Sequence, residues 1–226
     1  MNKLTKDQLL NIETYLNQKD LTQIDLRNEV LDHIANGIET KMNSENRSFE
    51  EAFTKEILIW DIELANYSSW WLGIAWIGPK IMMKKCVRTI KKNYLKALTY
   101  TIPAFLIIYL LNNFLDLSKY SLVVNITIGV IYLCIGCVSI ILYRTIRKSH
   151  YKTSYSFLFN RQGLPIIFIY FLNFLMNPLF VEICKIDMNQ SSINFMLFFH
   201  LFSISSAVLI YDLYKNHMKT KKMKLA

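Results

Sequence analysis

Two cysteines separated by two residues, Cys134 and Cys137, are the first candidates for chemistry in this chain of 226 residues. Such a CxxC pair supports thiol–disulfide exchange when one thiol has a lowered pKa and a partner thiol can reach it. Both cysteines fall near the middle of a long apolar stretch, where burial disfavours the thiolate. A membrane thiol oxidoreductase is therefore a weak alternative, and we expect both cysteines to be small packing residues.

Polar residues inside the apolar stretches are the second candidates. His200 is one of four histidines, which are too far apart in the sequence to predict a metal site. An ionisable residue in a membrane segment marks a functional site by default. Together with Asn125, Asn173 and Asn177, His200 predicts either a polar ligand pocket or contacts that hold neighbouring helices together, and we favour the second interpretation.

The sequence carries no signature of an enzyme. It contains no phosphate-binding loop, no serine-nucleophile motif and no pair of carboxylates within an apolar stretch. We therefore predict no catalytic residues, no metal and no cofactor.

The charges divide the chain into two parts. Residues 1–79 hold 7 basic and 13 acidic residues, a net charge of −6, whereas residues 80–226 hold 19 basic and 4 acidic residues, a net charge of +15. In the second part the basic residues flank apolar stretches. That arrangement is typical of membrane topology, and we expect no nucleic-acid partner.

Four apolar stretches are long enough to cross a bilayer, which requires about 20 residues each. They cover residues 97–115, 122–143, 164–183 and 193–211. The chain is 53% apolar and 19% charged, compared with about 45–50% and 25% in soluble domains. We therefore predict an all-α protein with a four-helix transmembrane bundle.

The orientation follows from the positions of the basic residues. Residues 80–96, 144–163 and 212–226 hold 17 of them, and the two other loops hold 2. Because basic loops stay in the cytoplasm, both termini should be cytoplasmic, in a bacterial inner membrane.

A juxtamembrane segment, residues 67–96, combines aromatic and basic side chains. The membrane-surface candidates are Trp70, Trp71, Trp76, Lys84, Lys85, Arg88, Lys91 and Lys92. Tryptophan favours the headgroup region, and a basic amphipathic helix favours an anionic leaflet. We expect this segment to lie along the inner leaflet; alternatively, the tryptophans belong to the core of the soluble domain.

Residues 1–66 predict a small, acidic, three-helix domain. Thr5 and Gln8 form a capping box at the start of a helix that should end near Gln18. A second helix is expected over residues 22–42, and Ser48 should cap a third.

The domain resembles a known family. The pattern Leu-Arg-Asn-Glu-Val-Leu-Asp-His-Ile over residues 26–34, followed by residues 38–42 and by Ser-Phe-Glu-Glu-Ala-Phe over residues 48–53, is similar to the HAAS-type or permease-prefix domain. These are helical modules that precede transmembrane segments in bacterial proteins. The resemblance implies a regulatory, sensory or transporter-associated membrane protein, and it brings no catalytic residues.

Two functions remain open. The first is a non-enzymatic signalling, regulatory or protein-interaction module, whose acidic domain docks on the basic juxtamembrane helix, on a partner protein or on a second copy. The second is a small transporter or transporter subunit with a polar site among its transmembrane helices.

Overall fold

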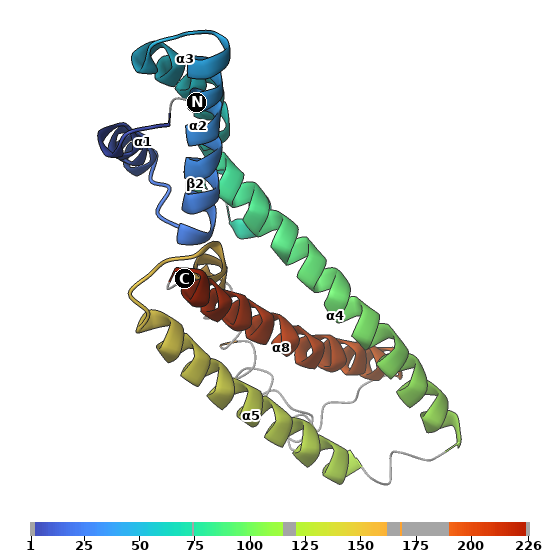
Figure 1. Ribbon diagram of the computed structural model, residues 1–226. Coiled ribbons are helices and arrows are strands. Elements are labelled where there is room, and N and C mark those ends of the chain that lie inside the picture. Colours follow the sequence, from blue (N-terminus) through green and yellow to red (C-terminus); the bar gives the residue numbers. More distant parts are fainter. Residues whose placement is uncertain (1–2, 74, 115–120, 162–167, 169–189, 225–226) are drawn as a thin grey trace. The chain divides into compact units, whose positions relative to one another are not determined.

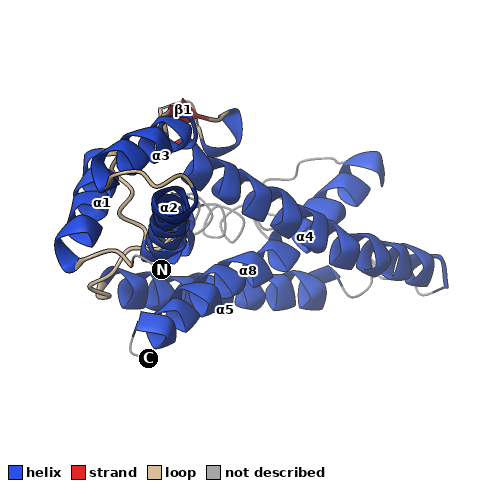
Figure 2. Ribbon diagram, turned by 45° about the horizontal axis from the view of Figure 1, so that its top comes forward, coloured by secondary structure: helices blue, strands red, loops and turns tan. Residues whose placement is uncertain are grey.

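The computed structural model describes residues 3–73, 75–114, 121–161, 168 and 190–224. This part of the chain is mostly helical (Figures 1 and 2). The labelled helices are α1 (Lys6–Gln18), α2 (Ile24–Ser44), α3 (Phe49–Leu64), α4 (Lys80–Phe114), α5 (Ser121–Arg147) and α8 (Gln190–Lys224). A further helical stretch covers residues 154–161.

The chain forms two compact units. The first unit comprises Met1–Ile90, His150–Phe157 and Lys219–Ala226, and the second comprises Lys91–Ser149 and Leu158–Met218. The first unit is therefore larger than the predicted domain of residues 1–66. It also takes in the start of α4 and parts of two segments that the sequence analysis identified as basic, residues 144–163 and 212–226.

Helices α1 to α3 begin where their capping residues predict. The Thr5 side chain accepts a hydrogen bond from the Gln8 backbone, and the Gln8 side chain completes the capping box. Ser48 accepts from the Glu51 backbone at the start of α3. Helix α2 has no side-chain cap and begins two residues later than predicted, at Ile24.

Helix α2 supplies the centre of the first unit, because it packs against both α1 and α3. Its buried side chains recur every four residues and form a single stripe along the helix. They are Leu26, Val30, Ile34 and Ile38. Residues Ile12 and Leu16 of α1 and Phe49 and Ala52 of α3 are also buried.

A short antiparallel hairpin differs from the predicted all-α fold. Strand β1 (Asn66–Ser68) pairs with β2 (Ile77–Pro79), and the 3₁₀ helix η1 (Trp70–Leu72) lies between them in the chain. Gly73 has a φ of 91°, which a glycine adopts without strain. Residues 66–79 hold no charged residue, and the three tryptophans lie between the two strands rather than in them. The prediction overlooked the hairpin because each strand is only three residues long.

Helix α4 includes residues 96 and 97, where the sequence analysis expects a surface segment to end and a span to begin. It continues through that point without interruption, as Figure 1 shows. The apolar face of its first turns is buried within the protein, with Met83 and Cys86 fully covered and Ile90 2% exposed. A helix that lies on a leaflet must instead insert that face into the lipid. These three apolar side chains are therefore covered by protein, and the placement of residues 67–96 along the inner leaflet stays a prediction.

Three of the described helices are long and apolar enough to cross a membrane. They correspond to Lys80–Leu111, Ile126–Arg147 and Leu197–Thr220. They overlap the first, second and fourth predicted spans, and the chain is compatible with a membrane protein. The third predicted span, residues 164–183, lies outside the described residues apart from Phe168.

Candidate functional site

Only one member of the predicted polar pocket has a described side chain. His200 is in α8 and is buried. Asn125 is in α5, but its side chain lies outside the described part of the structure, as do Asn173 and Asn177 entirely. The structure therefore leaves the predicted grouping of these four residues untested.

His200 instead contacts Tyr132, a residue that the sequence analysis did not single out. The two lie within the second unit, on α8 and α5, which run side by side in both ribbon views (Figures 1 and 2). The Tyr132 hydroxyl lies 2.8 Å from Nδ1 of His200 and 3.3 Å from its carbonyl oxygen. Nε2 of His200 is buried and has no hydrogen-bond partner among the described residues. Because buried polar atoms normally have a partner, this nitrogen is a candidate contact point for a ligand.

The two cysteines of the CxxC pair are exposed in the structure, whereas the sequence analysis expects them to be packing residues. Cys134 and Cys137 lie on the exposed surface of α5, and both are free thiols. A bilayer around this helix would cover them. Among the described residues, no group of three or more histidine, cysteine, aspartate or glutamate side chains is placed to hold a metal ion.

The tryptophans of the hairpin are exposed. Trp70 is 81% exposed, Trp71 is 49% exposed and Trp76 is 37% exposed. They are therefore not part of the core of the first unit, which was the alternative interpretation of this cluster.

The basic residues of α4 divide into two groups. Lys84, Arg88, Lys91 and Lys92 lie on the exposed side of the helix, whereas Lys85 is half-buried. Lys85 belongs to a polar cluster that the sequence analysis did not predict.

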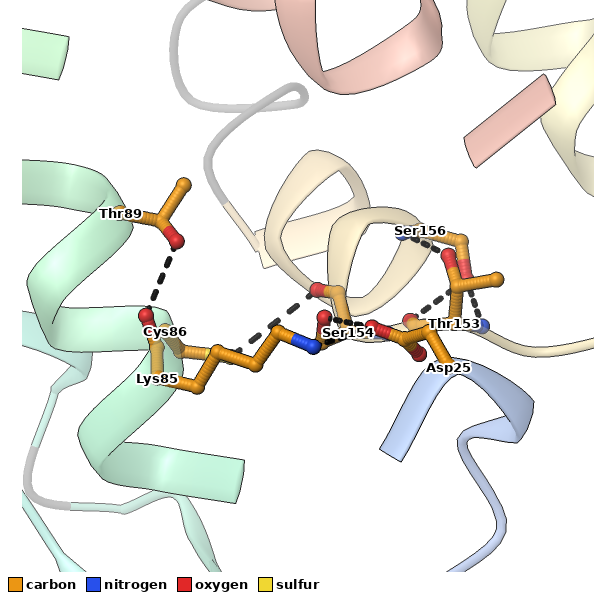
Figure 3. Close-up of polar contacts among 7 residues, drawn as sticks. All are labelled: Asp25, Lys85, Cys86, Thr89, Thr153, Ser154 and Ser156. Atoms are coloured by element: carbon orange, nitrogen blue, oxygen red, sulfur yellow. Dashed lines mark hydrogen bonds and ion pairs between the residues drawn. The ribbon is translucent and has the colours of Figure 1, made fainter. Parts of the chain in front are cut away.

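We call this cluster the Asp25 junction; it consists of Asp25, Lys85, Cys86, Thr153, Ser154 and Ser156 (Figure 3). The Asp25 side chain is 5% exposed. Its carboxylate accepts hydrogen bonds from the Ser154 backbone at 2.8 Å and from the Ser154 hydroxyl. The Lys85 ammonium group lies 3.1 Å from the same carboxylate. One side chain of α2 thus joins the start of α4 and the segment that follows α5, and Asp25, Lys85 and Ser154 all belong to the first unit.

A cap formed by Thr153 and Ser156 explains why the Ser154 N–H can bond to Asp25. The Thr153 hydroxyl accepts from the Ser156 backbone at 2.9 Å, and the Ser156 hydroxyl accepts from the Thr153 backbone at 2.9 Å. This reciprocal cap starts the helical stretch 154–161 and leaves the Ser154 N–H directed at Asp25. A carboxylate at a helix N-terminus is favoured by the exposed N–H groups and by the helix dipole.

Further contacts surround the same junction. The Ile24 backbone donates to the Lys152 carbonyl at 3.0 Å. The Cys86 thiol lies 3.9 Å from the Ser154 carbonyl, and the Lys85 ammonium lies 5.8 Å from the centre of the Tyr155 ring. A charged group held by several partners in this way is positioned more firmly than a surface ion pair.

A second acidic residue also pairs with the start of α4. Glu63 of α3 lies 2.9 Å from the Lys80 ammonium and 3.4 Å from that of Lys84. The hydrogen bond from Lys80 holds the pKa of the Glu63 carboxyl below its usual value. Helices α2 and α3 therefore each place a carboxylate on the basic start of α4.

The chemistry of the junction is that of docking: its groups form ion pairs, caps and hydrogen bonds. Residues 1–79 and residues 80–96 have opposite net charges, which predicts that the N-terminal helices and the start of α4 attract each other. No pattern in the sequence specified Asp25, because its partner Ser154 is 129 residues away.

Comparisons with known proteins assign no family to this chain. No protein-family model, no curated protein and no solved structure matches the chain.

Proposed function

We propose that the protein is a non-enzymatic membrane module for signalling, regulation or protein interaction, in which the acidic N-terminal helices dock on the basic start of α4. The observation that carries the proposal is the Asp25 junction. It joins the N-terminal helices to α4 and to residues 150–157 through one buried carboxylate. A movement of either segment would therefore act directly on the N-terminal helices.

The distribution of cations on α4 supports this docking. Lys80 and Lys85 point to carboxylates of the N-terminal helices. Arg88 and Lys92 lie on the exposed side of α4, where they remain available to an anionic lipid surface. The two groups allow the docking contact and any leaflet contact to be tested separately.

For the topology, we propose four spans in a bacterial inner membrane with both termini in the cytoplasm. Residues 150–157 and 219–226 belong to the same compact unit as residues 1–90. Segments that pack into one unit must share one side of a membrane. This grouping agrees with the positions of the basic residues.

We further propose that residues 1–66 are a HAAS-type module. The capped starts of α1 and α3 support this relationship, as does the packing of α2 against both. Modules of this type precede transmembrane segments, which fits a regulatory or sensory role.

The docking is tested by two charge-reversal variants of the full chain in lipid nanodiscs. Lys80→Glu/Lys85→Glu places like charges against Glu63 and Asp25, and it should raise amide exchange over residues 24–34 and 150–157 at least tenfold. The matched control, Arg88→Glu/Lys92→Glu, makes the same change in net charge on the exposed side of α4 and should leave exchange unchanged. Equal effects of the two variants would refute the docking.

A transporter is the second candidate, and the buried Nε2 of His200 favours it. A transport pathway would bring water to this atom. In a variant without native cysteines, His200→Cys should then react with a small charged thiol reagent, whereas Phe199→Cys, on the neighbouring exposed surface, should be shielded by lipid. Absence of any reaction at residue 200 would leave the Tyr132–His200 pair as a packing contact.

A further inference from the structure

Within the second unit, one short stretch of α8 holds both of the segments that lead to the Asp25 junction. The Lys96 ammonium group of α4 lies 2.7 Å from the carboxylate of Asp212. Five positions further along α8, Nε2 of His217 lies 3.0 Å from the hydroxyl of Ser149, which follows the end of α5 by two residues. All four residues belong to the second unit. We call this group the α8 clamp, because it ties α4 and the end of α5 to the same part of one helix.

The contact between His217 and Ser149 has a defined direction. The Ser149 hydroxyl donates its hydrogen to the Ile146 carbonyl at 2.6 Å. Because a hydroxyl has only one hydrogen, its oxygen accepts from an N–H at Nε2 of His217. His217 is fully buried. A buried donor that loses its acceptor keeps the cost of its desolvation, so this bond resists breaking.

The segments that the α8 clamp holds continue directly to the two donors of Asp25. Lys85 lies eleven positions before Lys96 in the same uninterrupted helix. Eleven residues make about three helical turns, so both lysines lie on one side of α4. Ser154 follows Ser149 by only five positions. Asp25 can keep its bonds to Lys85 and Ser154 together only while these two segments keep their spacing.

We infer that the α8 clamp controls the docking of the N-terminal helices at the Asp25 junction. A shift of α8 at its clamp residues moves α4 or the end of α5. That movement reaches Lys85 or Ser154, which are the donors of Asp25. Packed contacts break instead of stretching, so the Asp25 carboxylate loses a partner and the docking is weakened. This inference rests on the proposed function, because it names what regulates the same docking contact.

The test compares amide exchange over residues 24–34 and 150–157 in variants of the full chain in lipid nanodiscs. Asp212→Lys and Lys96→Asp each place like charges in the clamp, and each should raise exchange in both stretches at least tenfold. The combined variant Lys96→Asp/Asp212→Lys restores the attraction with the charges exchanged, and it should return exchange to the wild-type rate. The matched control is Lys92→Asp, because Lys92 is exposed on α4 one turn before Lys96 and undergoes the same change in charge; this variant should exchange normally.

The hydrogen-bonded half of the clamp has its own variants. His217→Leu removes the N–H that the Ser149 hydroxyl accepts, and it should raise exchange over residues 150–157. His217→Gln offers an amide N–H in its place and should exchange more slowly than His217→Leu. Equal rates in these two variants would contradict the role given to the bond with Ser149.

Three results would overturn the control by the α8 clamp: unchanged exchange in Asp212→Lys, an equal rise in Lys92→Asp, or no recovery in the combined variant. If Asp212→Lys does not fold, Asp212→Asn replaces it, because it removes the charge and keeps the shape of the side chain, and it should also raise exchange. The two proposals fail separately. Slow exchange over residues 150–157 in all variants refutes only the control by the α8 clamp, whereas fast exchange there in the wild-type chain refutes the docking itself.

Discussion

At the scale of single residues, the buried carboxylate of Glu56 has room to meet its partners because residue 37 is a glycine. Glu56 of α3 pairs with Lys41 and accepts a hydrogen bond from the Trp60 indole at 3.0 Å. A Cβ atom at Gly37 of α2 would lie 2.5 Å from Oε1 of Glu56. The glycine thus gives the carboxylate room to meet both partners, and any larger residue must displace it.

Gly37→Ala should therefore destabilise the first unit although alanine favours helices. Helix propensity contributes about 1 kcal/mol in favour of alanine, but displacing a buried, paired carboxylate costs about 3 kcal/mol. The expected net loss is about 2 kcal/mol in the free energy of unfolding, measured by urea denaturation of the full chain in detergent. The exposed neighbour Asn36→Ala is the control and should be neutral or slightly stabilising. A Gly37→Ala variant as stable as the wild type would contradict this account of the cluster.

The ion pair of Glu63 predicts a pH dependence. The pKa of Glu63 is lowered in the folded chain by its hydrogen bond from Lys80. The Glu63–Lys80 ion pair therefore contributes fully to the stability of the folded chain above the ordinary glutamate pKa of about 4.3. This contribution is lost as the pH falls through the lowered pKa of Glu63. Amide exchange over residues 60–66, corrected for intrinsic rates, should rise below about pH 4.

The control for this titration is Glu63→Gln, which has no charge to lose. Other carboxylates titrate in both proteins, so the difference between the two exchange profiles isolates Glu63. Identical profiles would show that the Glu63–Lys80 pair does not hold the end of α3 in place.

At the scale of elements, the local signals of the sequence were sufficient for the helix starts. Thr5 and Ser48 cap their helices as predicted, because a cap depends only on residues three positions away. The long apolar helices were likewise found from composition alone.

Elements that depend on distant contacts could not be predicted in the same way. The hairpin of residues 66–79 has strands too short to show an alternating pattern. The stretch 154–161 was assigned to a basic loop, because its cap is a Thr153–Ser156 pair without the usual acidic residue. The site at Asp25 requires two segments that only the tertiary fold brings together.

Helix α4 runs without interruption through residues 96 and 97, where the sequence analysis expected a boundary. This continuity can be tested directly. A single helix should protect the backbone amides of residues 91–100 without a break, because each is bonded within the helix. We expect slow exchange throughout this stretch in nanodiscs. Fast exchange confined to residues 95–98 would instead indicate a surface helix that ends before a separate span.

At the scale of the whole molecule, the net charge of +9 is the sum of two opposed regions. The acidic region and the basic start of α4 meet within one compact unit through Asp25, Glu63 and their lysine partners. The charge division therefore has two consequences: basic segments set the expected orientation in the membrane, and part of their charge holds the acidic helices.

The most direct test of this docking is crosslinking in native membranes at the backbone contact between Ile24 and Lys152, whose nitrogen and oxygen atoms are 3.0 Å apart. In a chain without native cysteines, Ile24→Cys/Lys152→Cys should be joined rapidly by a short bismaleimide. The control Asp32→Cys/Lys152→Cys moves one thiol about 12 Å along α2 and should react at least tenfold more slowly. Equal rates, or no product from the first pair, would contradict the docking of the N-terminal helices on residues 150–157.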